Sequence, residues 1–125
     1  MFAEMADRPA AHPEMKADAE LAVARMREMS PDLRGCAVLD AEGRVLAASG
    51  DPERWQTAGA ALFATADAAG NEQASHVHVA TEDGEAFAVR HEGLGMVAVA
   101  DRFTLASLMI FDMRAVLRDL AKGPD

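Results

Sequence analysis

The sequence predicts an α/β sandwich, in which helices cover both faces of a five-stranded antiparallel sheet. The chain has 125 residues, half of them hydrophobic, which suits one domain with a core of its own. Three segments repeat apolar residues at helical spacing, and five short apolar runs have the length of strands. Short turns rich in glycine and acidic residues separate several of these runs, which favours antiparallel pairing. The expected order of elements is α-β-β-α-β-β-β-α.

The first helix is expected to begin at Pro13 and to end before Pro31. Proline is favoured in the first turn of a helix, and the residue before a proline avoids helical backbone. Between these prolines, apolar side chains recur at helical spacing: Met15, Ala19, Ala22, Val23, Met26 and Met29. Residues 1–12 show no such period, so we expect a flexible tail there and a folded domain over residues 13–123.

Two short apolar runs on either side of an acidic turn predict a β-hairpin. The runs are residues 35–40 and 45–49, and Gly43 in the turn can adopt positive φ. Neither run alternates between apolar and polar residues, which predicts a sheet covered on both faces. The single cysteine, Cys36, is expected in the core, and the turn acid Asp40 is expected in solvent.

The second helix is expected to run from Asp51 to about Ala69, where Gly70 can close it. Asp51 is a capping residue, and a proline and an acid follow it at the first helical positions. The face expected to pack on the sheet carries Trp55, Ala58, Leu62, Phe63, Ala66 and Ala69. The opposite face carries alanines where a solvated helix normally carries charge: Ala60, Ala61, Ala64 and Ala68.

Three further apolar runs predict a meander of short strands at residues 75–81, 85–91 and 95–100. His76 and His78 share one face of the first strand because they alternate with valines. Two histidines so placed could bind a metal ion, could make a strand edge sensitive to pH, or could be ordinary polar residues. No cysteine or carboxylate stands at ligand spacing nearby, which argues against a metal site.

The last helix is expected to follow the capping residue Thr104 and to stop at Gly123. Asp112 and Asp119 lie toward the edge of its apolar stripe, and we expect them to pair with arginines of this helix or of the first. The stripe itself consists of Leu105, Met109, Met113, Val116 and Leu120.

The composition argues against several classes of function. A formal net charge of −9 disfavours general nucleic-acid binding and attachment to anionic lipid. No apolar run has the length of a membrane span and no secretory signal is recognised, so we expect a cytoplasmic protein. One cysteine cannot form a disulfide within the chain or a Cys-only zinc site. P-loop, metalloprotease, nucleophile-elbow and kinase motifs are absent, so we expect neither an enzyme nor a bound cofactor.

The order of elements and the first hairpin resemble the roadblock/dynein light chain family. The stretch Gly35-Cys36-Ala37-Val38-Leu39-Asp40-Ala41-Glu42-Gly43-Arg44-Val45-Leu46-Ala47-Ala48-Ser49 is similar to a family signature of a small-apolar strand, Asp-x-x-Gly, an apolar strand and Ser. The strand at 96–100 and the helix at 105–120 also fit, so the resemblance covers nearly the whole chain beyond the tail. These motifs reflect hairpin and core physics and carry no chemistry of their own.

The resemblance implies a homodimer or heterodimer that binds a small Ras-like GTPase. In the family, the second helix packs on its two-fold mate, and the third strand pairs with its copy into one continuous sheet. Some members are adaptors on the dynein motor, and bacterial members often partner a GTPase and in some systems a sensor kinase. We therefore expect a dimer interface at Ala60, Ala61, Ala64, Ala68, His76 and His78, and partner contacts at Glu53 and Thr57.

The residues support a dimer independently of the resemblance. Alanine lets two helices approach closely across a two-fold axis, although it is also the best helix former and is abundant in this chain. The strand at 75–81 would otherwise be a bare sheet edge, which proteins usually pair or cover. Two other functions stay open: a ligand-sensing domain of profilin-like or PAS-like shape, with a pocket between sheet and helix, and a scaffold without a GTPase.

Overall fold

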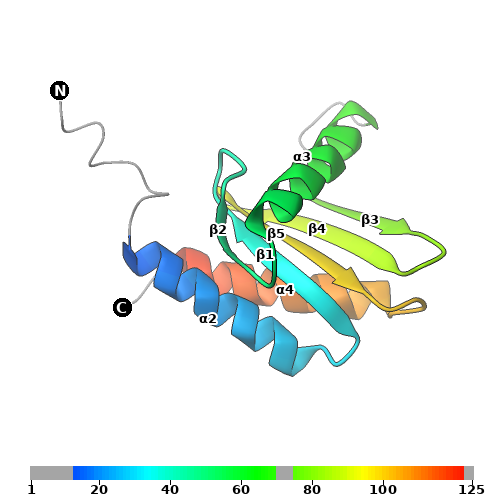
Figure 1. The fold of residues 1–125 in the computed structure, drawn as a ribbon, viewed down its shortest axis with the longest axis horizontal. Helices are drawn as coiled ribbons and strands as arrows, with labels where there is room; N and C mark the ends of the chain where they lie inside the picture. The colour runs from blue at the N-terminus through cyan, green and yellow to red at the C-terminus, as the bar shows by residue number, and fades with distance from the viewer. Residues whose placement is uncertain (1–12, 70–74, 123–125) are drawn as a thin grey trace.

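The computed structural model describes residues 13–69 and 75–122 (Figure 1). Within this part of the chain the elements follow the predicted order α-β-β-α-β-β-β-α. They are α2 Pro13–Met29, β1 Leu33–Leu39, β2 Val45–Ala48, α3 Pro52–Ala69, β3 His76–Ala80, β4 Glu85–His91, β5 Leu94–Ala100 and α4 Ala106–Lys122. The predicted tail at 1–12 and the predicted helix-ending residues Gly70 and Gly123 lie outside the described residues.

The five strands form one antiparallel sheet in the order β2-β1-β5-β4-β3. Pairing of β1 with β5 joins the first hairpin to the later meander and places Cys36 opposite Ala98. The β4–β5 turn has Glu92 and Gly93 at positive φ, a conformation that matches the twist of a tight hairpin. β2 and β3 are the two edges of this sheet.

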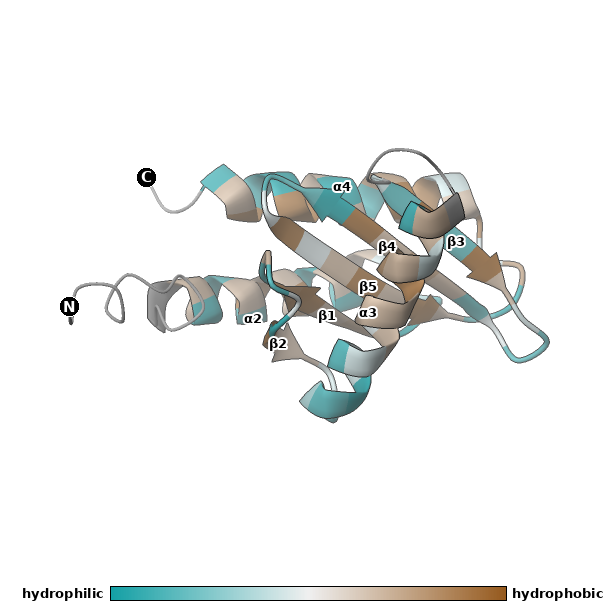
Figure 2. Ribbon diagram, turned by 90° about the horizontal axis from the view of Figure 1, so that it is seen from above, coloured by the Kyte–Doolittle hydropathy of each residue, from teal (hydrophilic) through white to brown (hydrophobic). Residues whose placement is uncertain are grey.

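Helices cover both faces of the sheet, with α2 and α4 on one face and α3 on the other (Figures 1 and 2). The larger core cluster lies under α2 and α4 and contains the fully buried Met26, Phe87 and Met113. The smaller cluster lies under α3 and consists of Leu39, Phe63, Ala88 and Val97. β1 is buried on both faces, which explains why its sequence does not alternate. No helix within the described residues is long and apolar enough to cross a bilayer.

α2 and α4 run antiparallel across their face of the sheet. Arg25 on α2 donates a hydrogen bond to Asp119 on α4 at 3.0 Å, and the Ser30 hydroxyl donates to Asp112 at 3.3 Å. The predicted pairing with an arginine of the first helix is confirmed for Asp119, whereas Asp112 meets a serine. The hydrogen bond from Arg25 holds the pKa of the Asp119 carboxyl below its ordinary value.

The ends of the helices differ from the predictions in three places. Leu105 precedes α4 and is 64% exposed, while Leu117, which was not predicted, is fully buried. The Thr104 hydroxyl donates to the carbonyl of Asp101 at 2.6 Å, and α4 begins only at Ala106, so Thr104 lies before the cap position. Met29 is the last residue of α2 and is partly exposed rather than in the core.

Asp40, which was expected in solvent, is buried and organises the β1–β2 turn. One of its carboxylate oxygens accepts the backbone N–H groups of Glu42 and Arg44, both at 2.9 Å. Gly43 completes the turn with a φ of 85°. The Asp-x-x-Gly segment of the hairpin therefore stabilises the local turn.

We expect the Cys36 thiol to be unreactive in the folded chain. Cys36 is fully buried in β1, and burial raises its pKa to about 12, so little thiolate forms near neutral pH. Iodoacetamide at pH 8 should label the chain slowly in buffer and rapidly in urea. Rapid labelling of the native chain would contradict this expectation.

The same pKa shift predicts how Cys36 affects stability at alkaline pH. The unfolded thiol ionises near its usual pKa of 9.0, whereas the folded thiol stays protonated up to about 12. The stabilising contribution of the buried thiol is therefore complete below pH 9.0 and is lost between pH 9.0 and about 12.

Candidate functional site

α3 is anchored to the sheet at its first turns. Asp51 accepts the backbone N–H of Glu53 at 3.0 Å, which confirms the predicted cap. The Trp55 indole N–H donates to the carbonyl of Ser49 at 2.8 Å. Gly35 leaves room for this indole, since a Cβ there would come within 3.1 Å of the ring. Gly35 and Ser49 open and close the hairpin signature, and both position α3.

Gly59 brings the middle of α3 close to the sheet. It is buried, and a Cβ there would lie 2.8 Å from Leu39 Cδ1 and 3.2 Å from Val97 Cγ2. A side chain at this position would therefore push α3 away from the strands. Gly59 was not predicted as a site residue, although a lone glycine inside a helical pattern is a signal of close packing.

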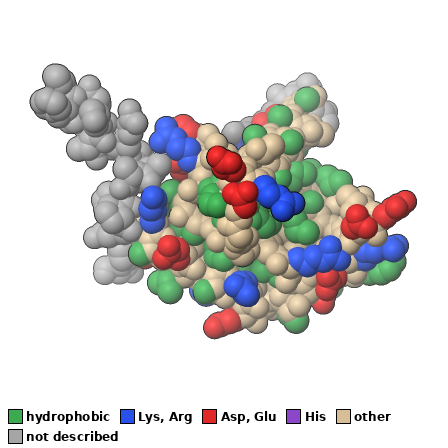
Figure 3. Space-filling model, viewed as in Figure 1, with side chains coloured by type: hydrophobic (Ala, Val, Ile, Leu, Met, Phe, Trp, Pro, Cys, Tyr) green, Lys and Arg blue, Asp and Glu red, His purple; other side chains and the backbone are tan. Residues whose placement is uncertain are grey.

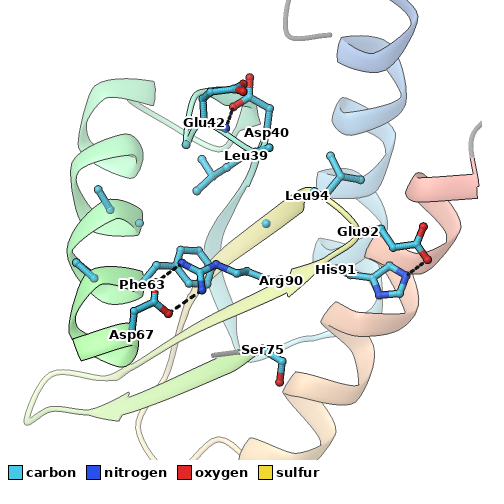
Figure 4. Close-up of a pocket in the computed structure, with 17 residues that line it drawn as sticks. Leu39, Asp40, Glu42, Phe63, Asp67, Ser75, Arg90, His91, Glu92 and Leu94 are labelled. Atoms are coloured by element: carbon cyan, nitrogen blue, oxygen red, sulfur yellow. Dashed lines mark hydrogen bonds and ion pairs between the residues drawn. The ribbon is translucent and has the colours of Figure 1, made fainter. Parts of the chain in front are cut away.

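Arg90 on β4 ties the C-terminal half of α3 to the sheet (Figure 4). Its guanidinium donates to both carboxylate oxygens of Asp67, at 2.8 and 3.0 Å. The same group lies 4.1 Å from the centre of the Phe63 ring. A two-point ion pair stacked on an aromatic ring has a fixed geometry, so these three side chains hold the second half of α3 in place.

The outer face of α3 carries the residues that the sequence predicts to make contacts. All of them are exposed: Glu53, Thr57, Ala60, Ala61, Ala64 and Ala68. Steps of three and four residues keep them on the side of the helix that faces away from the sheet. Ala58, which was predicted to face the sheet, is exposed as well. The side of α3 that faces the sheet carries the buried residues Gly59 and Phe63 instead.

A groove of about 730 Å³ runs along one side of α3 (Figure 4). Its walls are α3, the β1–β2 turn and the β4–β5 turn, and the Arg90–Asp67 pair contributes to its lining. Ala60 and Ala64 also line the groove, whereas Ala61 and Ala68 lie outside it. The predicted alanine face therefore has two parts, which we call the groove alanines (Ala60 and Ala64) and the ridge alanines (Ala61 and Ala68).

β3 offers an open backbone edge on the other side of α3 (Figures 1 and 2). The Ser75 carbonyl accepts from Arg90 N–H, and Thr81 N–H donates to the Gly84 carbonyl, both at 2.8 Å. Backbone groups alternate in direction along an antiparallel strand, so odd-numbered residues of β3 bond to β4. The N–H and C=O groups of His76, His78 and Ala80 therefore point outward along the edge.

The side chains of the two histidines turn toward the face that α4 covers. His76 Nδ1 lies 2.8 Å from a guanidinium nitrogen of Arg114 on α4. His78 stacks on Phe87, with ring centres 4.6 Å apart, and its Nε2 lies 2.7 Å from Glu85 Oε1. The described residues contain no group of three or more side chains suited to hold a metal ion. The pH-sensitive edge stays a prediction.

The opposite face of β3 adds apolar surface beside α3. Val77 is partly buried against the cluster under α3, and Val79 is 38% exposed. Figure 3 shows hydrophobic side chains along α3 and over the strands beside it on this face of the molecule. The small side chains of α3, the exposed Val79 and an open strand edge together make a surface suited to contact with another protein chain.

Comparison with known proteins identifies the fold. No family model and no curated protein matches the sequence. Among solved structures, a Roadblock/LC7 domain from Streptomyces avermitilis matches with a TM-score of 0.72 at 16% identity, over 82% of this chain and 94% of that one. MglB from Myxococcus xanthus matches with a TM-score of 0.67 at 12% identity, over 89% of this chain and 90% of that one.

A profilin from Schizosaccharomyces pombe is also similar, with a TM-score of 0.60 at 15% identity over 83% of this chain and 97% of that one. The predicted fold class is therefore confirmed, including its likeness to profilin. The strand order, the helices on both faces and these matches across most of the chain lead to one conclusion: the chain has the Roadblock/LC7 fold.

Proposed function

We propose that the chain forms a homodimer through β3 and α3, and that the dimer is a non-catalytic regulator or scaffold that binds a small Ras-like GTPase. The observation that supports this most strongly is the open edge of β3 beside the exposed ridge of α3. A second copy that approaches along this edge would meet both features at once. A two-fold axis makes such a contact self-complementary, because each copy offers the same strand and the same helix.

The backbone of β3 supports the sheet part of this dimer. The outward groups of His76, His78 and Ala80 are spaced to pair with the same groups of an antiparallel copy. This pairing would extend the sheet across both chains and would leave no bare edge at β3. The predicted roles of His76 and His78 would thus be carried by their backbone, while their side chains bind within their own chain.

The ridge of α3 supports the helical part of the dimer. Ala61 and Ala68 carry no long side chains, so two such helices can pack at an axial distance of about 8 Å. Thr57 and Glu53 continue the exposed face toward the start of α3, where the second helix would no longer cover them. We assign these two residues to the partner.

The choice of a GTPase as partner follows from the roadblock resemblance of the sequence, which the fold supports. Two α3 helices side by side would form a platform, and the groove alanines would line a recess at each flank. A protein partner could insert a side chain into this recess, because Ala60 and Ala64 have small, uncharged side chains. The proposal therefore gives the dimer a binding surface that one copy alone does not have.

The test combines mass measurement with nucleotide-dependent capture. We expect the mass of two chains by light scattering at micromolar concentration, and capture of a Ras-like GTPase from the native host in the presence of a GTP analogue or GDP. The Ala61→Arg variant should be monomeric and should capture no GTPase. Thr57→Arg should stay dimeric and should lose the GTPase. Purified GTPase with and without the chain then shows whether hydrolysis or exchange changes.

Ala24→Arg is the matched control, because Ala24 is an exposed alanine on α2, on the other side of the sheet. It should change neither mass nor capture. If the wild-type protein has the mass of one chain, the proposed dimer and its platform do not exist. If the protein is a dimer that captures no GTPase in either nucleotide state, the result would contradict the GTPase as partner and would support a scaffold without a GTPase.

The groove favours one alternative, a domain that senses a small molecule. Its volume of about 730 Å³ is in the range of ligand pockets, and its lining combines the Phe63 ring with charged side chains. A ligand of the groove should raise the melting temperature of the wild-type chain, and Ala64→Trp should abolish that rise. Unchanged stability across a metabolite panel would count against this alternative.

A further inference from the structure

Four large apolar side chains are exposed around the start of α4, on the face of the sheet opposite α3. Phe103 is 84% exposed, Leu105 64%, Leu108 54% and Phe111 65%. A single exposed leucine is ordinary in a folded protein, but four large apolar side chains exposed within nine consecutive residues are a concentration that calls for an explanation. We call these four residues the α4 patch.

The backbone holds Phe103 in an unfavourable conformation that displays its ring. Its φ of 65° lies in the left-handed region, which bulky residues rarely adopt. The buried carboxylate of Glu85 accepts the Phe103 N–H at 2.7 Å, and the other oxygen of Glu85 lies 2.7 Å from His78 Nε2. Strain that surrounding contacts maintain is typical of binding and functional sites.

The helix geometry explains why no other described helix covers the patch. Leu108 and Phe111 are three residues apart on the side of α4 away from the sheet, whereas Met109 and Met113 point into the core. α2 ends at Met29, and the residue after it bonds to Asp112. The first turns of α4 therefore extend beyond the end of the neighbouring helix.

The segment that carries the patch is basic, whereas the whole chain is acidic. Between residues 101 and 122, four basic side chains stand against three carboxylates, in a chain with a net charge of −9. Each of these carboxylates has a partner within the chain: Asp119 pairs with Arg25, Asp112 bonds to Ser30 and Asp101 pairs with Arg34. The Arg102 guanidinium lies 4.8 Å from the Phe103 ring, and Arg118 is an exposed residue of α4 two turns after Phe111.

We propose that the α4 patch binds an acidic amphipathic helix of a partner protein. Apolar residues of that helix would cover Leu108 and Phe111, and its carboxylates would meet the basic rim. A second copy of this chain fits less well, because a two-fold contact here would bring like charges together. An anionic membrane is an extended surface and would meet the net negative charge of the whole chain, whereas a single helix contacts only the patch and its basic rim.

This surface and the α3 platform lie on opposite faces of the sheet, so both can be occupied at the same time (Figures 1 and 2). The chain would then link the partner on α4 to whatever α3 and β3 bind. The proposal does not depend on the GTPase, since it needs only the exposed start of α4.

The test uses two fluorescein-labelled helical peptides of equal length with the same Leu and Phe stripe, one with Glu and the other with Lys at the remaining positions. Fluorescence anisotropy should show binding of the Glu peptide at least tenfold tighter than of the Lys peptide, with a marked dependence on salt. The double substitution Leu108→Ala and Phe111→Ala should weaken binding by at least about tenfold. Arg118→Glu should slow association and reduce its dependence on salt.

Leu21→Ala is the matched control, because Leu21 is 66% exposed on α2, outside the patch. It should leave binding unchanged, and equal losses in Leu21→Ala and in the double variant would refute a specific site. Equal binding of the two peptides would also overturn the proposal. So would patch-dependent binding to phosphatidylserine vesicles, a lower mass of the double variant in light scattering, or peptide binding that appears only when residues 1–12 are deleted. Each of these three results would identify a different occupant, namely a membrane, a second copy or the chain's own N-terminal segment.

Discussion

Replacement of Ala80 by proline is expected to convert the proposed dimer into a monomer without unfolding the chain. The backbone N–H of Ala80 points away from β4, so proline removes a donor that the pairing of β3 with β4 does not use. In a two-fold pairing of β3 edges the donor is lost from both copies, and the proline ring blocks the close approach of the strands. The mass in light scattering should fall to the 13.3 kDa of one chain.

Ala80→Thr is the control for this experiment. Threonine keeps the N–H and is well suited to a strand, so the dimer should persist. Far-ultraviolet circular dichroism should match the wild type for both variants, because the pairing of β3 with β4 uses the odd-numbered residues. A dimeric Ala80→Pro chain would show that β3 is not the contact, and the interface would then have to be sought on α3 alone.

Replacement of Phe87 by alanine is expected to cost the chain about 3–5 kcal/mol of unfolding free energy. Phe87 is the largest of the fully buried side chains among the described residues. It lies on β4, in the cluster under α2 and α4. Its ring also stacks on His78, so a cavity here loosens the strand that carries the open edge. Urea unfolding at one fixed protein concentration measures the loss, since unfolding of a dimer depends on concentration.

Phe111→Ala is the matched control for Phe87→Ala. The same atoms are removed from a side chain that is 65% exposed, so stability should change by about 0.5 kcal/mol or less. A large loss in Phe111→Ala would mean that the start of α4 is covered in solution. Similar small losses in both variants would contradict the assignment of Phe87 to the core.

The local elements were predictable because each has a pattern with its own period or its own turn. The bounds of α2 and β4 agree with the prediction at both ends. Asp51 marks the start of α3 through a cap that involves only its near neighbours. The apolar runs of the strands indicate a sheet covered on both faces, and the structure confirms it.

The candidate site was predictable only in part. The exposed alanines of α3 follow from a pattern in the sequence, and the edge position of β3 was expected from the family resemblance; both are found. The Arg90–Asp67 pair was not foreseen, because its two members come from a strand and a helix far apart in the sequence. The division of the alanines between groove and ridge depends on where the two turns lie, and no helical period contains that information.

The hydropathy of an apolar residue also does not tell which other residues it contacts in the fold. Leu105 and Leu117 are the same amino acid near and within one helix, yet the first is exposed and the second is buried. The two leucines differ in burial because of where α2 ends and how α4 packs on the sheet. Both depend on contacts between residues that are distant in the sequence. The buried Glu85, which bonds to His78 and to the Phe103 backbone, is likewise a product of tertiary structure.

The order of the elements, their approximate bounds and the turns between them can be predicted from the sequence, because these depend on neighbours a few residues away. The strand order, the close approach at Gly59, the groove beside α3 and the exposed start of α4 depend on how the elements pack together. Each of these arises where segments distant in the chain pack together. The free energy of such packing depends on both of the surfaces in contact. The hydropathy pattern of one segment describes only one of those two surfaces.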